Sequence, residues 1–175
     1  EVGTIDTTHS DWHNINFSYD FVDDPVVLTQ IQTNNDSNFV KTRHNNITQD
    51  GFEVLLEKDE ANNGTSYGIE TVAWMAISSG TGSWDGNTFM AGNTGDQVTH
   101  DWHTIGFGNA FNNTPKFLGN IASYYRPDPS GLRYQNLNNG NVQIKIEEDT
   151  SADSEIGHTT EDVDYLAIEA TGTLI

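Results

Sequence analysis

The sequence predicts an all-β protein made of two tandem antiparallel β-sandwich units of about six strands each. Three observations predict this class. The second half of the chain repeats the first at an offset of 90 residues. Hydrophobic and polar residues alternate in short runs, which is the period-two pattern of half-buried strands. Clusters of glycine, asparagine and aspartate separate these runs, and no stretch keeps a helical period for long.

The repeat is marked by a phrase that occurs twice, as THSDWHNINF at residues 8–17 and as THDWHTIGF at residues 99–107. The offset of 90 residues gives 12 identities over 48 ungapped positions. A one-residue insertion then aligns IETVAWMAI, residues 69–77, with TEDVDYLAI, residues 160–168. Identity of this extent indicates a duplicated structural unit. The identical pairs are Trp12/Trp102, His13/His103, Ile15/Ile105, Phe17/Phe107, Phe21/Phe111, Pro25/Pro115, Leu28/Leu118, Ile31/Ile121, Arg43/Arg133, Asn46/Asn136, Glu57/Glu147 and Asp59/Asp149.

The boundary between the copies falls in a segment rich in glycine, serine and asparagine, residues 78–97. We predict a first domain at residues 1–80, a linker at 81–90 and a second domain at 91–175. The chain begins with Glu1 rather than methionine, and its end, ATGTLI, resembles SGTGSW at the boundary. We therefore expect a piece of a longer protein that carries further domains, with any export signal outside this sequence.

The strand pattern can be followed along the first copy. In WHNINFSYDF, Trp12 lies on the face opposite Ile15 and Phe17, so the tryptophan is expected at the rim of the sandwich or facing outward. In ETVAWMAIS, Glu70 shares a face with Val72. The four predicted strand segments cover residues 12–21, 25–33, 51–59 and 70–78.

The charge of the chain excludes several partners. It carries 26 acidic against 7 basic side chains, for a formal net charge of −19. Such a field repels phosphate, so nucleic acid and anionic membrane surfaces are not expected partners. No run approaches the roughly 20 apolar residues of a membrane span. There is no cysteine, which excludes disulfides and thiol chemistry.

The order of the segments INFSYDF, PVVLTQI, R…NNITQDGFEV and VAWMAI resembles the H-type lectin domain. The resemblance covers roughly Trp12–Ile77 and Trp102–Ile168, and it implies a six-stranded antiparallel sandwich that binds carbohydrate. The sugar-binding residues of the family are largely not matched. Phe39 and Pro129 stand where the family has an arginine, and Asp59-Glu60 stands where it has a tryptophan–histidine pair. A different set of residues is therefore expected to bind any sugar.

Aromatic and basic residues supply the candidate ligand-binding set. Exposed tryptophan is a good platform for a pyranose ring, although rim packing is the simpler interpretation of Trp12 and Trp102. The segment ASYYRPDPSG has no equivalent in the first copy, and its aromatics beside arginine are typical of sugar sites. The full set is Trp12, His13, Arg43, Trp102, His103, Tyr124, Tyr125, Arg126 and Arg133.

The duplicated arginines have two interpretations. We expect Arg43 to lean toward the core with Glu70, and Arg133 with Glu161, because a lone buried charge is costly. A guanidinium oriented by a carboxylate could instead bind a sugar hydroxyl or a uronate.

Acidic loops suggest calcium as the cofactor. EKDEANNGTSYGIE at residues 57–70 and EEDTSADSEIGHTTE at residues 147–161 concentrate oxygen ligands around glycine, although neither has EF-hand spacing. A solvated acidic hairpin is the other interpretation. The candidate metal ligands are Asp59, Glu60, Asn62, Glu70, Asp149, Asp153 and Glu161.

These observations predict a non-catalytic carbohydrate-binding module of a larger secreted or cell-surface protein, with a polysaccharide or glycan as partner. The alternative is a structural or adhesin spacer repeat stabilised by calcium, without a sugar ligand. Glu57 and Glu70 could supply the two carboxylates, about 5–10 Å apart, of a glycan-cleaving enzyme. Because no second aromatic subsite is recognisable, no enzymatic activity is expected, and no oligomeric state is predicted.

Overall fold

The computed structural model describes residues 1–8, 11–62 and 68–170, and this part of the chain is all-β, as predicted. The first unit contains β1 (Val2–Thr7), β2 (His13–Asn16), β3 (Val26–Ile31), β4 (Val40–Asn45), β5 (Gly51–Lys58), the short 3-10 helix η1 (Glu60–Asn62) and β6 (Glu70–Ile77). The second contains β7 (Gly80–Trp84), β8 (Asn87–Asn93), β9 (His103–Gly106), β10 (Lys116–Ile121), β11 (Ser130–Gln135), β12 (Asn141–Glu148) and β13 (Val163–Ile168).

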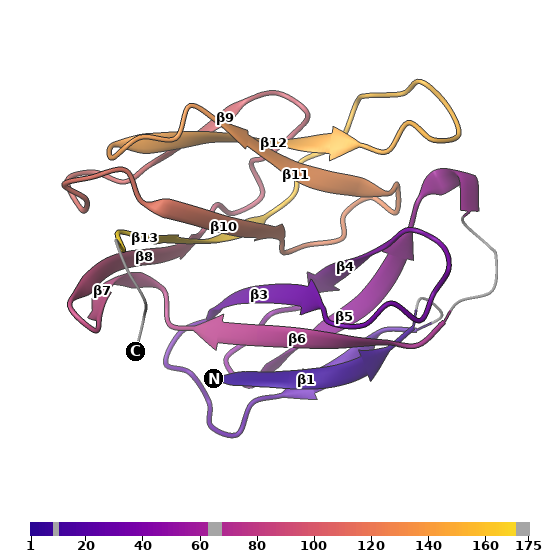
Figure 1. Ribbon diagram of the computed structural model, residues 1–175, viewed down its shortest axis with the longest axis horizontal. Coiled ribbons are helices and arrows are strands. Elements are labelled where there is room, and N and C mark those ends of the chain that lie inside the picture. The colour runs from indigo at the N-terminus through magenta and orange to yellow at the C-terminus, as the bar shows by residue number, and fades with distance from the viewer. Residues whose placement is uncertain (9–10, 63–67, 171–175) are drawn as a thin grey trace.

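Each unit is a sandwich of two antiparallel sheets (Figure 1). The first unit has the strand orders β1-β6-β3 and β2-β5-β4. The second has β10-β13-β8-β7 and β11-β12-β9. Without β7, each unit has six strands, which confirms the predicted architecture.

Strand register confirms the duplication. His13 pairs with Val54 in the first unit, and in the second unit His103 pairs with Ile144, with both residues 90 positions further on. The one-residue insertion appears where it was predicted, because Ile31 pairs with Val72 whereas Ile121 pairs with Val163.

The first strand of each unit needs one correction to the sequence alignment. Gly3 pairs with Trp74, and Gly92 pairs with the equivalent Tyr165. A Cβ on Gly3 would lie 2.5 Å from the Trp74 ring, and one on Gly92 would lie 2.7 Å from the Tyr165 hydroxyl oxygen. The two glycines are therefore structural equivalents, although the 90-residue offset placed Gly3 beside Asn93.

Residues 81–90, expected to form a linker, lie in a hairpin of the second unit. Strands β7 and β8 pair from Gly80 with Ala91 to Trp84 with Asn87. Asp85 and Gly86 between them both have positive φ, as a tight two-residue hairpin turn requires.

Each sandwich encloses its own hydrophobic core. Phe17, Phe52 and Trp74 pack at ring distances of 5.7 to 5.9 Å in the first core. Ile105, Phe107 and Val142 lie in the second. The alternation predicted for residues 70–77 is confirmed, since Glu70, Val72, Trp74 and Ala76 are all buried.

The two units pack closely against each other along β3. A third buried cluster joins Val26 of β3 to Ala91 and Leu166 of the second unit. The backbone N–H of Val27 donates to Asp164 Oδ2 at 2.6 Å. Side chains of the second unit thus cover the open edge of β3, which would otherwise expose unpaired backbone groups. The described part of the chain contains no helix that could span a membrane.

Candidate functional site

A cavity of about 530 Å³ opens at the junction of the two units. One wall is the loop after β10, which carries Tyr124 and Tyr125, and the opposite wall is the turn after β4. Asn46 in that turn has φ of 49°, a left-handed conformation that asparagine tolerates. We call this cavity the tyrosine pocket; its described lining consists of Asp24, Pro25, Asn45, Asn46, Ile47, Asn93, Ala122, Ser123, Tyr124, Tyr125 and Asp162.

The lining of the tyrosine pocket is rich in hydrogen-bond acceptors. Its described residues include the carboxylates Asp24 and Asp162 and no lysine, arginine or histidine. Oδ1 of Asn45 and Oδ1 of Asp162 are buried without a hydrogen-bond partner. Burial and the charge of Asp96 raise the pKa of Asp162 above its usual value. The pocket therefore favours a ligand that brings hydrogen-bond donors.

The two tyrosines occupy different environments. Tyr125 is 58% exposed, and its hydroxyl donates to Asp162 Oδ2 at 3.5 Å. The nearby charge of Asp162 and burial raise the pKa of Tyr125. Tyr124 is half-buried between the edge-on ring of Trp12, at a centroid distance of 5.3 Å, and the guanidinium of Arg43, 4.8 Å from its ring centroid. Tyr124 is thus held rigidly, and Tyr125 is presented to solvent.

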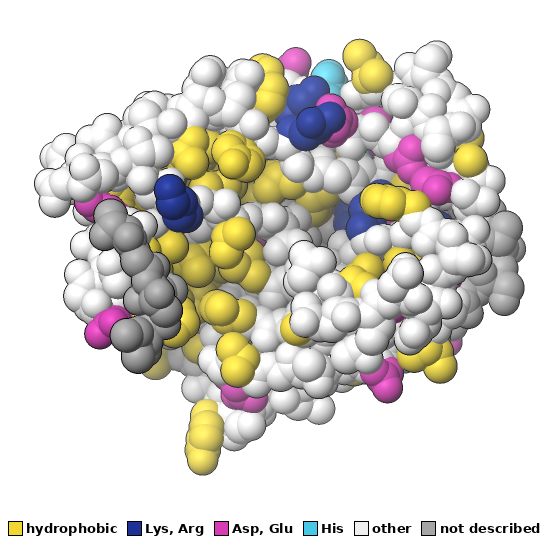
Figure 2. Space-filling view, viewed as in Figure 1, with side chains coloured by type: hydrophobic (Ala, Val, Ile, Leu, Met, Phe, Trp, Pro, Cys, Tyr) yellow, Lys and Arg dark blue, Asp and Glu magenta, His cyan; other side chains and the backbone are white. Residues whose placement is uncertain are grey.

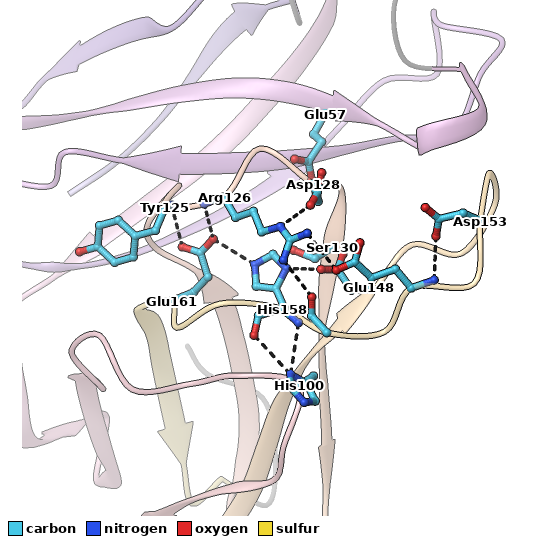
Figure 3. A network of polar contacts seen from close by, with 12 residues as sticks. Glu57, His100, Tyr125, Arg126, Asp128, Ser130, Glu148, Asp153, His158 and Glu161 are labelled. Atoms are coloured by element: carbon cyan, nitrogen blue, oxygen red, sulfur yellow. Dashed lines mark hydrogen bonds and ion pairs between the residues drawn. The ribbon is translucent and has the colours of Figure 1, made fainter.

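Glu161 fixes the loop that carries the tyrosines. Its carboxylate accepts hydrogen bonds from the backbone N–H of Tyr125 at 3.1 Å and of Arg126 at 3.4 Å, and from the Ser123 hydroxyl. Figure 3 shows Glu161 between this loop and His158. Burial alone would raise the pKa of Glu161, but hydrogen bonds from His158 and Ser123 hold it below its usual value.

Glu70 fixes the corresponding loop of the first unit, which follows β3. It accepts from the backbone N–H of Asn35 at 2.7 Å and of Asp36 at 2.6 Å, and from the Thr33 hydroxyl. Glu70 and Glu161 are thus equivalent loop anchors. Only the loop held by Glu161 carries tyrosines.

A buried network of charges lies beneath the tyrosine pocket and crosses the junction. Arg43 of the first unit donates to Glu57 at 3.3 Å and to Glu161 of the second unit at 3.2 Å. It also donates to the Ser130 hydroxyl at 3.2 Å and to the Ser123 carbonyl at 3.1 Å. Because the arginine is 1% exposed, these bonds are shielded from solvent.

His158 extends the network within the second unit. Its Nδ1 lies 2.6 Å from Glu148 Oε1, and its Nε2 lies 3.1 Å from Glu161 Oε1. Burial would lower the pKa of His158, but the hydrogen bonds with Glu161 and Glu148 outweigh it and raise the pKa. Both ring nitrogens face carboxylates, so the imidazolium, in which both donate, is the form that fits the site.

The expected pairing of Arg43 with Glu70 is wrong, and so is that of Arg133 with Glu161. Strand alternation from Arg43 to Ile47, which packs against the first core, would turn Arg43 inward, but the left-handed Asn46 interrupts the alternation after β4 ends. Arg43 pairs across the strands with Leu55 and points out of the first sandwich toward the second. Arg133 has a 63% exposed side chain and pairs with Glu147.

The other candidate ligand-binding residues lie apart from the pocket. His13 accepts from the Thr8 backbone N–H at 3.3 Å, and His103 begins β9. Trp102 is 42% exposed, with the Lys145 ammonium 5.4 Å from its ring centroid. Arg126 points away from the tyrosines to bind Asp128 and Glu155.

The acidic loops meet at the other end of the junction. Asp149 Oδ2 accepts from the Glu60 backbone N–H at 3.1 Å, and Asp59 Oδ1 accepts from the Asn62 backbone N–H at 2.8 Å. Burial and the charge of Asp153 raise the pKa of Glu60. Within the described ranges, no group of three or more histidine, aspartate or glutamate side chains is arranged to hold a metal ion. Part of the first loop, residues 63–67, lies outside the described residues. Calcium therefore stays a prediction.

Two further cavities lie along the junction. One, of about 540 Å³, has a mainly polar lining that includes Arg43 and Glu70. The other, of about 630 Å³, is lined by Leu28, Met75 and Leu118, and Figure 2 shows hydrophobic side chains gathered between β10 and β6. Neither contains tyrosine. The cavities share Thr29, Gln30, Gly119 and Asn120.

Several residues of the site were not predicted from sequence. Asp162 and Asn45 come from segments more than 100 residues apart. His158 lies in the predicted acidic loop, but nothing in its sequence context indicated two carboxylate partners. Two signs of the loop anchors were available: Glu70 aligns with Glu161, and Thr33 and Ser123 are both hydroxyl residues at the 90-residue offset.

Comparison with known proteins gives one similarity. No family model and no solved structure matches the chain. A stretch of Halomucin from Haloquadratum walsbyi (strain DSM 16790 / HBSQ001) is 33% identical over 172 residues. The match spans 97% of this chain but only 2% of Halomucin. The chain is therefore similar to one small segment of a much longer protein.

Proposed function

We propose that the chain is a non-catalytic carbohydrate-binding module of a larger secreted or cell-surface protein. The tyrosine pocket is the observation that carries this proposal. An exposed tyrosine ring offers a stacking surface for a pyranose, and the surrounding carboxylates and amides accept hydrogen bonds from sugar hydroxyls.

The similarity to Halomucin and the composition of the chain support the cell-surface part of the proposal. The chain matches only 2% of Halomucin, a much longer protein, which supports a place for the chain within a larger protein. The absence of cysteine and the net charge of −19 are compatible with an extracellular domain held by core burial in a salt-rich medium.

Glu57 and Glu70 are both engaged by structural partners, although Glu70 also lines the polar cavity of about 540 Å³. Glu57 accepts from Arg43 and lies 3.3 Å from the Lys41 ammonium, while Glu70 anchors a loop. These engagements favour binding over cleavage as the function of the module.

A glycan array tests the proposal. Wild-type protein is expected to bind a subset of glycans, and Tyr125→Ala to lose that binding, because the stacking surface disappears. Tyr134→Ala is the matched control, since Tyr134 is 55% exposed and does not line the pocket. Array binding that survives Tyr125→Ala, or no binding by the wild type, would contradict the proposal.

A calcium-stabilised spacer is the second candidate function, and the environment of Glu60 favours it. Glu60 lies among the charges of Asp153, Asp149 and Asp128, and its Oε2 is buried without a hydrogen-bond partner. A cation would relieve this repulsion. If the chain is such a spacer, its melting temperature is expected to be higher in calcium than in EDTA, and Glu60→Gln is expected to reduce this difference. No glycan on the array is then expected to bind.

A further inference from the structure

We propose that the tyrosine pocket selects sugars that carry a protonated amine, such as hexosamines with a free amino group, over uncharged and anionic sugars. This inference rests on the proposed carbohydrate-binding function and names the class of ligand. It follows from the charges in the pocket, from the hydrogen-bonding capacity of its lining and from the position of the nearest cations.

The described lining of the pocket supplies negative charge without a compensating cation. Asp24 and Asp162 are its only described ionisable residues besides the tyrosines. The carboxylate of Glu161 lies directly behind the loop, bonded to the Tyr125 N–H. An anionic sugar would meet this charge unpaired, whereas an ammonium would offset it.

The nearest arginines are unable to attract an anion into the pocket. Arg43 lies beyond the Tyr124 ring, with Glu57 and Glu161 as its carboxylate partners. Arg126 is paired with Asp128 and Glu155. Each arginine thus faces two carboxylates, and neither lines the pocket.

The lining also has the combination of groups that recognises ammonium. Aromatic rings attract cations through their faces, and a neighbouring carboxylate adds direct ionic attraction. Tyr125 is exposed with Asp162 at its hydroxyl end, so ring and carboxylate are adjacent. An amine also donates up to three hydrogen bonds.

Unpartnered oxygens favour the same ligand. Oδ1 of Asn45 and Oδ1 of Asp162 have no donor. Both belong to side chains with broad terminal torsions, so a small rotation would turn them toward a bound donor. The hydroxyls of the sugar would then supply the remaining donors to the amides of Asn46 and Asn93, which also line the pocket.

Isothermal titration with matched disaccharides tests the proposal. The probes are the β-1,4-linked glucosamine dimer, its N-acetylated counterpart, a galacturonate dimer and spermidine, a non-sugar amine. We expect the glucosamine dimer to bind about tenfold more tightly than the N-acetylated dimer, a difference of the size expected for one partly desolvated cation–carboxylate contact. The galacturonate dimer is expected not to bind.

Variants assign the effect to the pocket. Asp162→Asn is expected to lower the affinity for the glucosamine dimer about tenfold, to that for the N-acetylated dimer, so that the preference for the free amine disappears. Asp153→Asn is the control for the general acidity of the protein, because Asp153 lies outside the pocket. It is expected to leave the preference intact.

The outcomes separate this inference from the carbohydrate proposal. Equal affinity for both dimers, or a preference for the N-acetylated one, would overturn amine selection while carbohydrate binding stands. Spermidine binding as tightly as the glucosamine dimer would also overturn it, because the sugar would then contribute nothing. Failure of every sugar to bind, on the array and in titration, would contradict the carbohydrate function itself.

Discussion

Arg43 donates to Glu161 at 3.2 Å across the junction of the two units, and both side chains are buried. The equivalent arginine, Arg133, remains in its own unit and pairs with Glu147 at the surface. A duplicated residue thus has two roles. In the first unit it joins the sandwiches, and in the second it is one half of an exposed ion pair.

This relationship predicts that the two arginines differ in their effect on stability. Arg43→Met removes the cation that Glu57 and Glu161 share and leaves them only Lys41 and His158, so we expect the free energy of unfolding to fall by about 3 kcal/mol, the lower end of the range for breaking a buried pair. Urea unfolding followed by tryptophan fluorescence measures it. Arg133→Met is the matched control and is expected to unfold at the wild-type urea concentration. Equal shifts for the two variants would show that Arg43 does not join the units as described.

The fold was predictable because its signals are local. Alternation in residues such as Val72, Trp74 and Ala76 identifies a strand and its buried face without knowledge of distant contacts. The duplication added independent support, since each unit had to accommodate the same pattern. The sandwich class and the insertion before β13 followed from these two signals, whereas the strand orders are known only from the structure.

The site was only partly predictable, because it is formed between units. The sequence identified Tyr124 and Tyr125 through their lack of an equivalent in the first copy. It gave no indication that Asn45 would face them, since the relative placement of two similar sandwiches depends on surface packing. The prediction for Arg43 was wrong for a local reason: Asn46 adopts a left-handed conformation that ends strand alternation.

Because of the buried Asp164, we expect the stability of the protein to decrease as pH rises toward neutrality. Burial raises its pKa to about 7, against a reference of 3.8, although it accepts from Val27 and Asn93. The neutral carboxyl is therefore favoured in the folded state. Its contribution to stability is present below about pH 4 and is lost as pH rises through about 7.

Asp164→Asn tests this dependence. The amide mimics the neutral carboxyl, and Asn93 can turn its own amide to match at the cost of the hydrogen bond that its Oδ1 accepts from the Gly95 backbone N–H. We expect the variant to exceed wild-type stability at pH 8 by on the order of a few kcal/mol, with a flatter profile between pH 4 and 8. Urea unfolding across this range measures it, with the exposed Asp101→Asn as control. Parallel profiles for wild type and Asp164→Asn would contradict the prediction.

The buried His44 is expected to lower stability as pH falls, whereas Asp164 lowers it as pH rises. Burial in the first core, with the charge of Arg43, lowers its pKa to about 3 from 6.5. The neutral imidazole is thus favoured in the fold. Its contribution is present above about pH 6.5 and is lost as pH falls toward 3.

Histidine ring protons in NMR spectra test this prediction directly. The His44 signal is expected to show no titration between pH 8 and 4. The His158 signal is the comparison, because the pKa of this ring is raised and the ring is expected to titrate above the ordinary histidine value of about 6.5. A His44 midpoint near 6.5 would contradict burial of a neutral ring.

We expect ligand binding to depend on Glu161, although this residue does not line the pocket. Glu161→Gln keeps the shape of the side chain but weakens its bonds to the N–H groups of Tyr125 and Arg126. The tyrosine loop should then sample other positions. We expect affinity for the glycan that the array identifies to fall by about tenfold, which corresponds to one weakened charge-assisted hydrogen bond.

Glu70→Gln is the matched control for this positioning role. Glu70 makes the equivalent bonds to Asn35 and Asp36, but its loop does not carry the tyrosines. Both variants are expected to lose stability in urea, because each weakens a buried loop anchor, and only Glu161→Gln is expected to lose affinity. Amide spectra should show changes at Tyr125 in Glu161→Gln alone. If both variants lost affinity equally, general destabilisation would explain the effect, and Glu161 would have no specific part in positioning the pocket.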